Sequence, residues 1–305
     1  MFLVLTSCLA NGSTAAPYIK AAARDIKAYR DSKGYRKIPI GYSAGMSLPR
    51  EDAWGVLANA TVADISELRP MLQNYLACSS NAAENLDFFS LNAYEWCGGE
   101  SSYKVSGYSQ LQANASGYSI PIFFSETGCN TAPPRTFQDQ AAIFGTDMAD
   151  TWSGAIIYEW LQEANQYGLI SYGPEAAATA TDALGGFTRS GTPTPVSPDY
   201  TNLKNQWATL TPTGVALSAY SPSASNLKPP PCPSSTANGW VVNGDIALPS
   251  VGQSGAATAT AANTASGTAS SPSASATKGA ANGGKELAGM SIGLAGVMLG
   301  FIVWL

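Results

Sequence analysis

The stretch Ile120-Pro-Ile-Phe-Phe-Ser-Glu-Thr-Gly128 decides the fold, because it reads as a buried strand that runs directly into a carboxylate. It has the length of a strand and is rich in β-branched and aromatic residues, which favour pleated structure. Three further runs share this character, at residues 37–42, 88–94 and 155–158. Each run ends in polar or charged residues, so we expect four short buried strands.

Segments with helical periodicity lie between these runs. Apolar side chains recur on one face of residues 19–29 and again of residues 137–148. Pro17 suits the first turn of a helix. Buried strands that alternate with amphipathic helices predict a parallel sheet covered by helices, either a doubly wound sheet or a (β/α)₈ barrel. Four strands would be about half of such a barrel.

Aromatic side chains and carboxylates follow the ends of the predicted strands. These ends read Asn92-Ala-Tyr94-Glu95-Trp96, Ser125-Glu126-Thr127-Gly128 and Tyr158-Glu159-Trp160. In parallel α/β folds, functional side chains gather at the carboxyl ends of the strands. The sequence contains no histidine, which excludes Ser-His-Asp and Cys-His nucleophile systems and every zinc site that needs histidine. Hydrolytic chemistry would therefore have to use carboxylates.

The composition bounds the class of protein. With 305 residues, of which 45% are apolar, the chain can form one domain of ordinary size plus segments that need not pack. The net charge is only −5 and the 16 Lys and Arg form no basic run, so we expect no nucleic-acid partner. Five cysteines occur without a CxxC pair, which favours disulfides over a metal site: Cys8, Cys78, Cys97, Cys129 and Cys232. We expect neither a metal nor a cofactor.

The C-terminal end has the order of a glycosylphosphatidylinositol (GPI) attachment signal. Three small residues, Asn282-Gly-Gly284, precede a weakly polar spacer and the apolar residues 294–305. We therefore predict attachment at Asn282 and removal of residues 285–305. The alternative is a tail-anchored helix over residues 287–305, but no basic residue follows it as a cytoplasmic stop.

A low-complexity segment precedes this signal. From about residue 249 to 284 the chain is almost wholly Ser, Thr, Ala and Gly, which predicts a disordered, O-glycosylated stalk. The prolines at 229–231 place the end of the compact domain near Cys232, so the stalk is predicted over 233–284. Asn59 and Asn114 begin N-glycosylation sequons, consistent with secretion. Residues 1–14 read either as a signal-like segment or as a truncated strand.

Five motifs in order resemble those of the fungal β-1,3-glucanosyltransferases of glycoside hydrolase family 72. They lie at residues 16–25, 34–44, 87–98, 123–130 and 152–158, and the resemblance covers about 15–232. It implies a retaining enzyme on a (β/α)₈ TIM barrel, in which the four predicted strands are strands five to eight. The chain therefore resembles the C-terminal part of such a barrel, followed by the stalk and the apolar tail.

The resemblance also implies the catalytic residues. Glu126 matches the nucleophile that ends strand seven of the family; it would form a glycosyl-enzyme that a sugar hydroxyl resolves in place of water. The acid/base glutamate of the family ends strand four, before the segment that begins at about residue 15. No glutamate precedes Arg24 here, and strands one to three have no counterpart, so we expect the isolated chain to be nearly inactive.

Further residues at the strand ends are expected to contact the substrate. Sugar rings stack on aromatic side chains, which favours Tyr94, Tyr158 and Trp96, with Trp160 a weaker candidate. Asn92 is expected to contact the substrate because it also ends a strand. Hydrogen-bonding or surface roles are expected for Glu95, Glu159 and Glu163. The family pattern implies the disulfides Cys97–Cys129 and Cys78–Cys232, with Cys8 unpaired.

The sequence thus predicts a monomeric β-1,3-glucanosyltransferase that acts on donor and acceptor chains of β-1,3-glucan in the fungal cell wall. It would be held on the outer leaflet of the plasma membrane by a GPI anchor. Two alternatives stay open. One is an endo-β-1,3-glucanase on the same fold, and the other is a catalytically inactive glucan-binding wall protein, which the missing acid/base glutamate leaves possible.

Overall fold

The protein is described by a computed structural model over residues 12–45, 70–177, 180, 183, 186–187, 189–214, 216, 218–220, 227–235, 240–244 and 246–251. All of these lie in one of the two compact units of the chain, Phe2–Gly255. Several predictions concern residues outside the described ranges: Cys8 and the rest of 1–11, Asn59, the stalk beyond 251, Asn282 and the tail 285–305.

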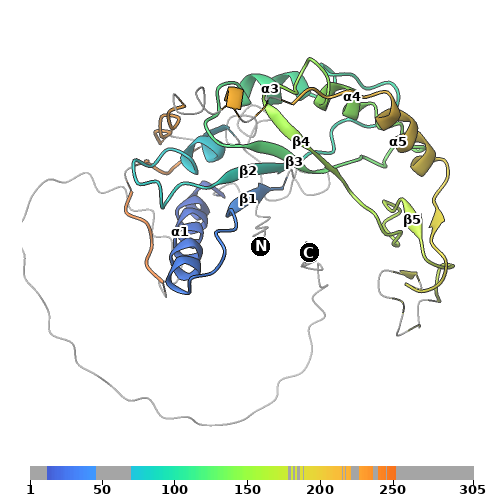
Figure 1. Ribbon diagram of the computed structural model, residues 1–305, viewed down its shortest axis with the longest axis horizontal. Helices are drawn as coiled ribbons and strands as arrows, with labels where there is room; N and C mark the ends of the chain where they lie inside the picture. Colours follow the sequence, from blue (N-terminus) through green and yellow to red (C-terminus); the bar gives the residue numbers. More distant parts are fainter. Residues whose placement is uncertain are drawn as a thin grey trace, which may run out of the picture. The chain divides into compact units, whose positions relative to one another are not determined.

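A sheet of four parallel strands forms the centre of the described unit (Figure 1). The strands are β1 (Gly41–Ala44), β2 (Phe88–Asn92), β3 (Ile122–Thr127) and β4 (Trp152–Ile157), and they lie in the order β1-β2-β3-β4. Every neighbouring pair is parallel, which confirms the α/β class and the parallel sheet. The doubly wound and barrel alternatives both contain such a sheet.

The first strand begins later than the sequence predicted. Residues 37–39 are exposed and lie outside β1, and Pro39 has no N–H to give to a sheet. The backbone of Ile40 instead pairs with Asp87, whose N–H donates to the Ile40 carbonyl at 2.8 Å and whose carboxylate accepts from the Ile40 N–H at 2.7 Å. This pair aligns β1 with β2 just before their ladder begins.

Helices precede, connect and follow the strands. They are the 3₁₀ turn η1 (Gly12–Ala15) and the α-helices α1 (Ala16–Ser32), α3 (Tyr108–Ala115), α4 (Asp139–Ile143) and α5 (Asp199–Ala208). A short antiparallel pair, β5 (Ile170–Ser171) and β6 (Thr194–Pro195), follows β4. The helix predicted over 137–148 starts later and ends earlier, at Asp139 and Ile143. Phe137 stays outside it because its left-handed φ of 53° does not fit a helix. No described helix has the length and apolar character needed to span a membrane.

The two faces of the sheet differ in polarity. Side chains that alternate along the strands form the core with the helices: Tyr42, Phe89, Leu91, Ile122 and Phe124. The Phe124 ring stacks on Trp152 at 4.1 Å and on Tyr108 of α3 at 5.2 Å between ring centroids. The intervening residues Ser43, Ser90, Asn92 and Ser125 therefore face the other side of the sheet, which is the side of the candidate site. The rings of Phe88 and Phe123, 5.6 Å apart between centroids, lie on this side as well, at the start of the strands.

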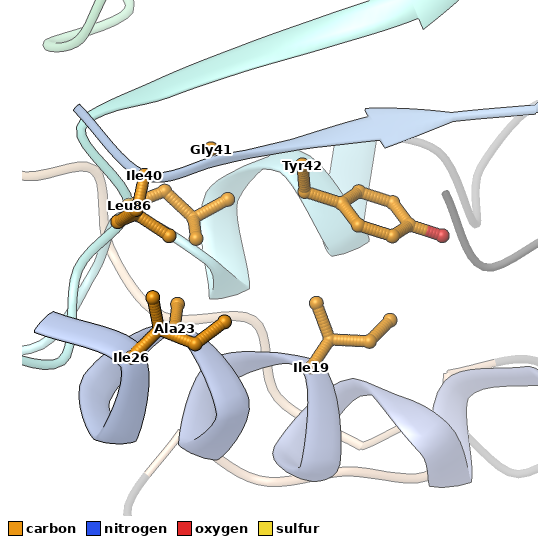
Figure 2. A pocket seen from close by; sticks show the side chains of 7 residues that line it. All are labelled: Ile19, Ala23, Ile26, Ile40, Gly41, Tyr42 and Leu86. Atoms are coloured by element: carbon orange, nitrogen blue, oxygen red, sulfur yellow. The ribbon is translucent and has the colours of Figure 1, made fainter. Parts of the chain in front are cut away.

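A small apolar pocket lies between α1 and the start of the sheet (Figure 2). Its lining residues are Ile19, Ala23, Ile26, Ile40, Gly41, Tyr42 and Leu86. At Gly41 a Cβ atom would overlap the Phe88 ring, so another residue would require that ring to move. Apart from the Tyr42 hydroxyl the lining is aliphatic or aromatic, and it belongs to the layer where helix and sheet pack, not to the site at the strand ends.

Two disulfides join distant parts of the unit, Cys78–Cys232 and Cys97–Cys129, the pairs that the family resemblance implies. The first links sequence positions 154 apart, and the second links positions 32 apart.

Asn114 begins the one predicted N-glycosylation sequon within the described residues. It lies in α3, where its side-chain oxygen accepts a hydrogen bond from Gln110 at 3.0 Å.

The packed domain extends beyond Cys232, where the sequence placed its end. Trp240 is 1% exposed, and its ring lies 5.5 Å from that of Tyr75, while Val242 also belongs to the core. A guanidinium nitrogen of Arg24 donates to the Pro249 carbonyl at 2.7 Å. The fold therefore does not end at the prolines before Cys232, because the indole of Trp240, which follows them in the sequence, packs in the core.

Candidate active site

A register shift in β3 brings Asn92 beside Glu126. Along β2 and β3, Leu91 pairs with Phe124, whereas the next residue, Asn92, pairs with Glu126. Ser125 is therefore the extra residue of an irregularity in β3, a device that re-aims side chains at the end of a strand. Figure 1 shows β2, β3 and β4 side by side, so the residues that follow their carboxyl ends share one edge of the sheet.

Two serine hydroxyls orient Asn92. Its Oδ1 accepts hydrogen bonds from Ser43 at 3.0 Å and from Ser125 at 2.7 Å, and the two hydroxyls lie 2.6 Å from each other. Asn92 is only 8% exposed. Because its oxygen is taken by these donors, its amide N–H groups are available to the carboxylate of Glu126, with which its side chain makes a hydrogen bond.

Glu126 is a partly buried carboxylate that accepts hydrogen bonds from two neighbouring side chains. Burial raises its pKa above the ordinary value, while the hydrogen bonds from Tyr94 and Asn92 lower it. The Tyr94 hydroxyl donates to Oε2 of Glu126 at 2.6 Å. Hydrogen bonds to the ionised form favour it, so these two donors hold a charged carboxylate in a site that partly excludes water.

Three tyrosine rings pack together beside this carboxylate, which Tyr94 contacts directly. The ring centroids are 6.3 Å apart for Tyr94 and Tyr158, 5.7 Å for Tyr94 and Tyr167, and 5.2 Å for Tyr158 and Tyr167, all edge to face. Burial raises the pKa of Tyr158 to about 12 and that of Tyr94 well above its usual range, so both hydroxyls stay protonated. The trio offers aromatic faces and neutral O–H donors next to an anion.

Tyr167 was not predicted from the sequence. It lies nine residues after Tyr158, in an irregular segment with no strand signal of its own. The segment folds back, so that the N–H of Glu159 donates to the carbonyl of Tyr167 at 3.0 Å. Tyr167 thereby joins the trio through a backbone turn that periodicity cannot reveal.

Trp96 follows β2 and packs partly on the helix layer. Its ring contacts Tyr108 of α3 at 5.3 Å between centroids, and it packs against the core cluster. Substrate contact at Trp96 stays a prediction. Trp160, in contrast, is 57% exposed.

Two glutamates that follow β4 have polar partners. Glu159 accepts a hydrogen bond from Asn165 at 2.7 Å, and burial raises its pKa while this hydrogen bond lowers it. Glu163 forms an ion pair with Arg189. Both carboxylates are thus engaged within the segment that follows β4, in keeping with hydrogen-bonding roles.

The loop after Glu126 is fixed from both sides. The Cys97–Cys129 disulfide ties it to the segment that follows β2. Gly128 has a φ of 108°, and a Cβ atom there would lie 3.2 Å from the Tyr158 carbonyl oxygen. Glycine is needed at this position both for its backbone conformation and for the close approach of Tyr158.

A buried carboxyl group of α4 lies beside β3. Asp139 of α4 is 3% exposed, and burial raises its pKa to about 6. The side-chain nitrogen of Gln140 donates to the Asp139 carboxylate at 3.0 Å and to the Thr127 hydroxyl at 3.4 Å. Its side-chain oxygen accepts from the Trp207 indole of α5 at 3.0 Å.

Among the described residues, no group of three or more acidic or cysteine side chains could hold a metal ion.

Known proteins resemble this chain in sequence. The sequence model of the glucanosyltransferase family matches residues 8–185, which is more than half of the chain. Protein EPD1 of Candida maltosa is 39% identical over 236 residues, covering 77% of this chain and 36% of that protein. The 1,3-beta-glucanosyltransferase gas2 of Schizosaccharomyces pombe is 35% identical over 239 residues, covering 77% of this chain and 44% of that protein.

Solved structures agree with the sequence matches. Saccharomyces cerevisiae Gas2p, in its ligand-free form, superposes with a TM-score of 0.60 at 30% identity, covering 78% of this chain and 43% of that one. The same yeast protein in complex with laminaritetraose and laminaripentaose gives a TM-score of 0.57 at 30% identity. The chain spans less than half the length of the relatives and structures named here.

Proposed function

Because this chain belongs to the glucanosyltransferase family, we propose that it provides the nucleophile half of a retaining β-1,3-glucan transglycosylase that remodels the fungal cell wall. The observation that carries the proposal is Glu126, a strand-end carboxylate that accepts hydrogen bonds from Tyr94 and Asn92 beside the tyrosine rings. Glycosidases of the retaining type use such a carboxylate as nucleophile. Relatives that carry the name 1,3-beta-glucanosyltransferase, and the laminarioligosaccharides bound to yeast Gas2p, support the substrate class.

The reaction has two steps. An oxygen of Glu126 attacks the anomeric carbon of the donor glucan, and the C1–O bond to the leaving chain breaks. The leaving oxygen takes the electron pair of that bond and a proton from a general acid. In the second step a hydroxyl of the acceptor glucan attacks the same carbon, loses its proton to the base, and releases the Glu126 carboxylate. The product is a longer chain with the original β configuration.

The tyrosine trio would bind the sugar at this point. The edge-to-face arrangement of Tyr94, Tyr158 and Tyr167 leaves ring faces against which sugar C–H groups can stack. The Tyr94 hydroxyl has a second task, since it holds Oε2 of Glu126 and leaves the other carboxylate oxygen for attack. Asn92 completes the orientation of the carboxylate.

We further propose that β1–β4 are strands five to eight of a (β/α)₈ barrel. Their parallel order and the fit to yeast Gas2p support this assignment. In that frame the general acid belongs at the end of strand four, next to β1. No glutamate precedes Arg24 in the 305 residues, so these residues by themselves should protonate a leaving glucan poorly.

The test uses a donor that needs no acid. With β-laminaribiosyl fluoride as donor, the chain is expected to form the glycosyl-enzyme, because fluoride departs without a proton. Laminaritetraose as acceptor should then give a hexasaccharide in a slower second step, because the missing glutamate is also the base of that step. Unactivated laminarioligosaccharides should react more slowly by about 10² to 10⁴, the usual contribution of a general acid. Mass spectrometry of the products provides the measurement.

The products also separate the alternatives. Laminaribiose without any hexasaccharide would indicate hydrolysis and an endo-β-1,3-glucanase. Binding of laminaritetraose without any product would indicate a glucan-binding wall protein. Either result would overturn the proposed transglycosylase.

We also propose that the chain acts as a monomer held on the outer leaflet of the plasma membrane by a GPI anchor at Asn282. The small residues 282–284, the spacer and the apolar tail support this proposal. Phosphatidylinositol-specific phospholipase is expected to release the protein from fungal membranes into the soluble fraction. A protein that stays on the membrane after complete digestion, with Leu305 still present by mass spectrometry, would contradict it.

A further inference from the structure

Arg135 is a buried cation that the proposed chemistry does not use. It lies in the loop between β3 and α4, and it is 2% exposed. Its Nε donates to Oδ2 of Asp199 at 2.6 Å, and its backbone N–H donates to Oδ1 of the same carboxylate at 3.2 Å. A buried charge without such a partner would be costly, so Asp199 of α5 makes the position possible.

The rest of the guanidinium faces the chain that follows β4. We call residues 158–170 the rim segment. Nη1 of Arg135 donates to the Tyr158 carbonyl at 3.1 Å, and Nη2 donates to the Gly168 carbonyl at 3.4 Å. The guanidinium also lies 4.9 Å from the ring centroid of Phe137 and 5.9 Å from that of Tyr167. A single side chain thus holds both the beginning and the end of the rim segment.

The rim segment has an ordered backbone of its own. The N–H of Glu159 donates to the Tyr167 carbonyl and the N–H of Leu169 to the Glu159 carbonyl, both at 3.0 Å, and the N–H of Ile170 donates to the Trp160 carbonyl at 2.8 Å. These bonds close the segment into a turn, but they do not attach the turn to the loop of the nucleophile.

Arg135 and Asn130 supply that attachment. The Asn130 side-chain amide donates to the Asn165 and Gln166 carbonyls at 3.0 and 3.2 Å, in the middle of the rim segment, whereas Arg135 holds its two ends and meets Gly128 there. The Tyr158 carbonyl oxygen accepts a hydrogen bond from Arg135. The same oxygen is so close to Gly128 that a Cβ atom there would lie 3.2 Å from it. A Cβ at this position would also lie 3.6 Å from Nη1 of Arg135. Since Gly128 is two residues from Glu126, the guanidinium, the rim segment and the nucleophile loop meet at one point.

We infer that Arg135 is a positioning residue: it holds the rim segment so that Tyr158 and Tyr167 stay beside Tyr94 and Glu126. Lysine could not replace it fully, because two carbonyls and a carboxylate are bound by the planar fork of one guanidinium, whereas an ammonium is a point donor. The effect on glucan transfer rests on the proposed function, whereas the effect on the rim segment does not.

Hydrogen exchange of the full chain tests the positioning directly. In Arg135→Met, the amides of Glu159, Leu169 and Ile170 are expected to exchange at least tenfold faster than in the unaltered chain. The amides of β1 and β2 should keep their rates. A role in overall stability alone would raise exchange in the rim segment and in the sheet together.

Lys20→Met is the matched control. Lys20 is also a buried cation, 2% exposed, but its amine donates to the Tyr75 carbonyl at 2.8 Å and not to the rim segment. Its loss should leave the exchange of the three rim amides unchanged relative to the sheet. Arg135→Lys is expected to fall between the unaltered chain and Arg135→Met, since one of the two carbonyls can still be bound.

The transfer assay gives the second readout. With β-laminaribiosyl fluoride, Arg135→Met should raise KM about tenfold or more and lower kcat less, because the displaced tyrosines bind the sugar while Glu126 keeps its own donors. If Arg135→Met fails to fold, Arg135→Lys and Asp199→Asn carry the same exchange test.

The outcomes are distinguishable. Unchanged rim exchange in folded Arg135→Met or, failing that, in both substitutes would overturn the inference. Faster rim exchange in a chain whose unaltered form transfers no glycosyl group would support the positioning and overturn the proposed function.

Discussion

Replacement of Glu126 by glutamine is expected to slow glycosyl transfer from an activated β-1,3-glucosyl donor by roughly 10⁴ to 10⁶, the size of effect seen when a nucleophile is removed. The amide has nearly the same shape and can still accept the Tyr94 hydrogen bond, so the fold and the tyrosine trio should persist. What it lacks is the negative charge that forms the covalent bond to the anomeric carbon.

The covalent intermediate itself can be measured. A 2-deoxy-2-fluoro-β-laminaribiosyl fluoride slows both steps but retains a good leaving group, so the glycosyl group should accumulate on Glu126. Peptide mass spectrometry is expected to find the added mass on the peptide that contains this residue, and none in Glu126→Gln. Labelling should become faster as the pH rises through the raised pKa of Glu126, because only the ionised carboxylate attacks.

Glu159→Gln is the control for this experiment. Glu159 is also a partly buried carboxylate at a strand end, and its pKa is also raised by burial, but its oxygen accepts from Asn165. This variant should still take the label on Glu126. Labelling of Glu159 in place of Glu126, or a Glu126→Gln variant with transfer near the parent rate, would remove the basis of the nucleophile assignment.

Removal of the Cys78–Cys232 disulfide is expected to lower the free energy of unfolding by about 5 kcal/mol, from the entropy of the 154-residue loop that it closes. The reason lies in the unfolded chain, which gains freedom when the link is absent. A loss of this size is a large fraction of the stability of an ordinary domain. The double variant Cys78→Ala with Cys232→Ala can be measured by guanidinium chloride unfolding without reducing agent.

The second disulfide provides the comparison. Its loop is 32 residues, so Cys97→Ala with Cys129→Ala should lose about 4 kcal/mol by the same argument. The first variant should also expose Trp240, because the chain after Cys232 is no longer tied to Cys78. A smaller loss for the Cys78 and Cys232 pair than for the Cys97 and Cys129 pair would contradict the loop-entropy account.

The sheet could be predicted from the sequence because its strands are short and rich in aromatic and β-branched residues. The expectation that all four are buried is wrong for β4, which lies at the edge of the sheet and leaves Ile156 44% exposed. The same periodicity located α1. Two boundaries could not be foreseen, since they depend on single residues: Phe137 takes a left-handed conformation and delays the start of α4, and Trp240 returns to the core after a run of prolines. Neither event leaves a periodic signal.

The site was only partly visible in the sequence. Glu126, Tyr94 and Tyr158 follow strand ends directly, where the parallel-sheet rule places functional groups. Trp96 follows the same rule, and its ring also contacts Tyr108, because a residue after a strand can point to either layer. Tyr167 was missed because it reaches the site through the turn of the rim segment.

The buried carboxyl group of Asp139 makes folding of this domain a proton-binding reaction. The pKa of a free aspartate is 3.8, and that of Asp139 is raised to about 6 by burial. Between these values the folded chain keeps a proton that the unfolded chain has lost, so the free energy of unfolding falls as the pH rises from about 4 to about 6. The difference corresponds to about 3 kcal/mol. Protonation of Asp139 therefore stabilises the folded domain in an acidic medium, and this contribution is lost at neutral pH.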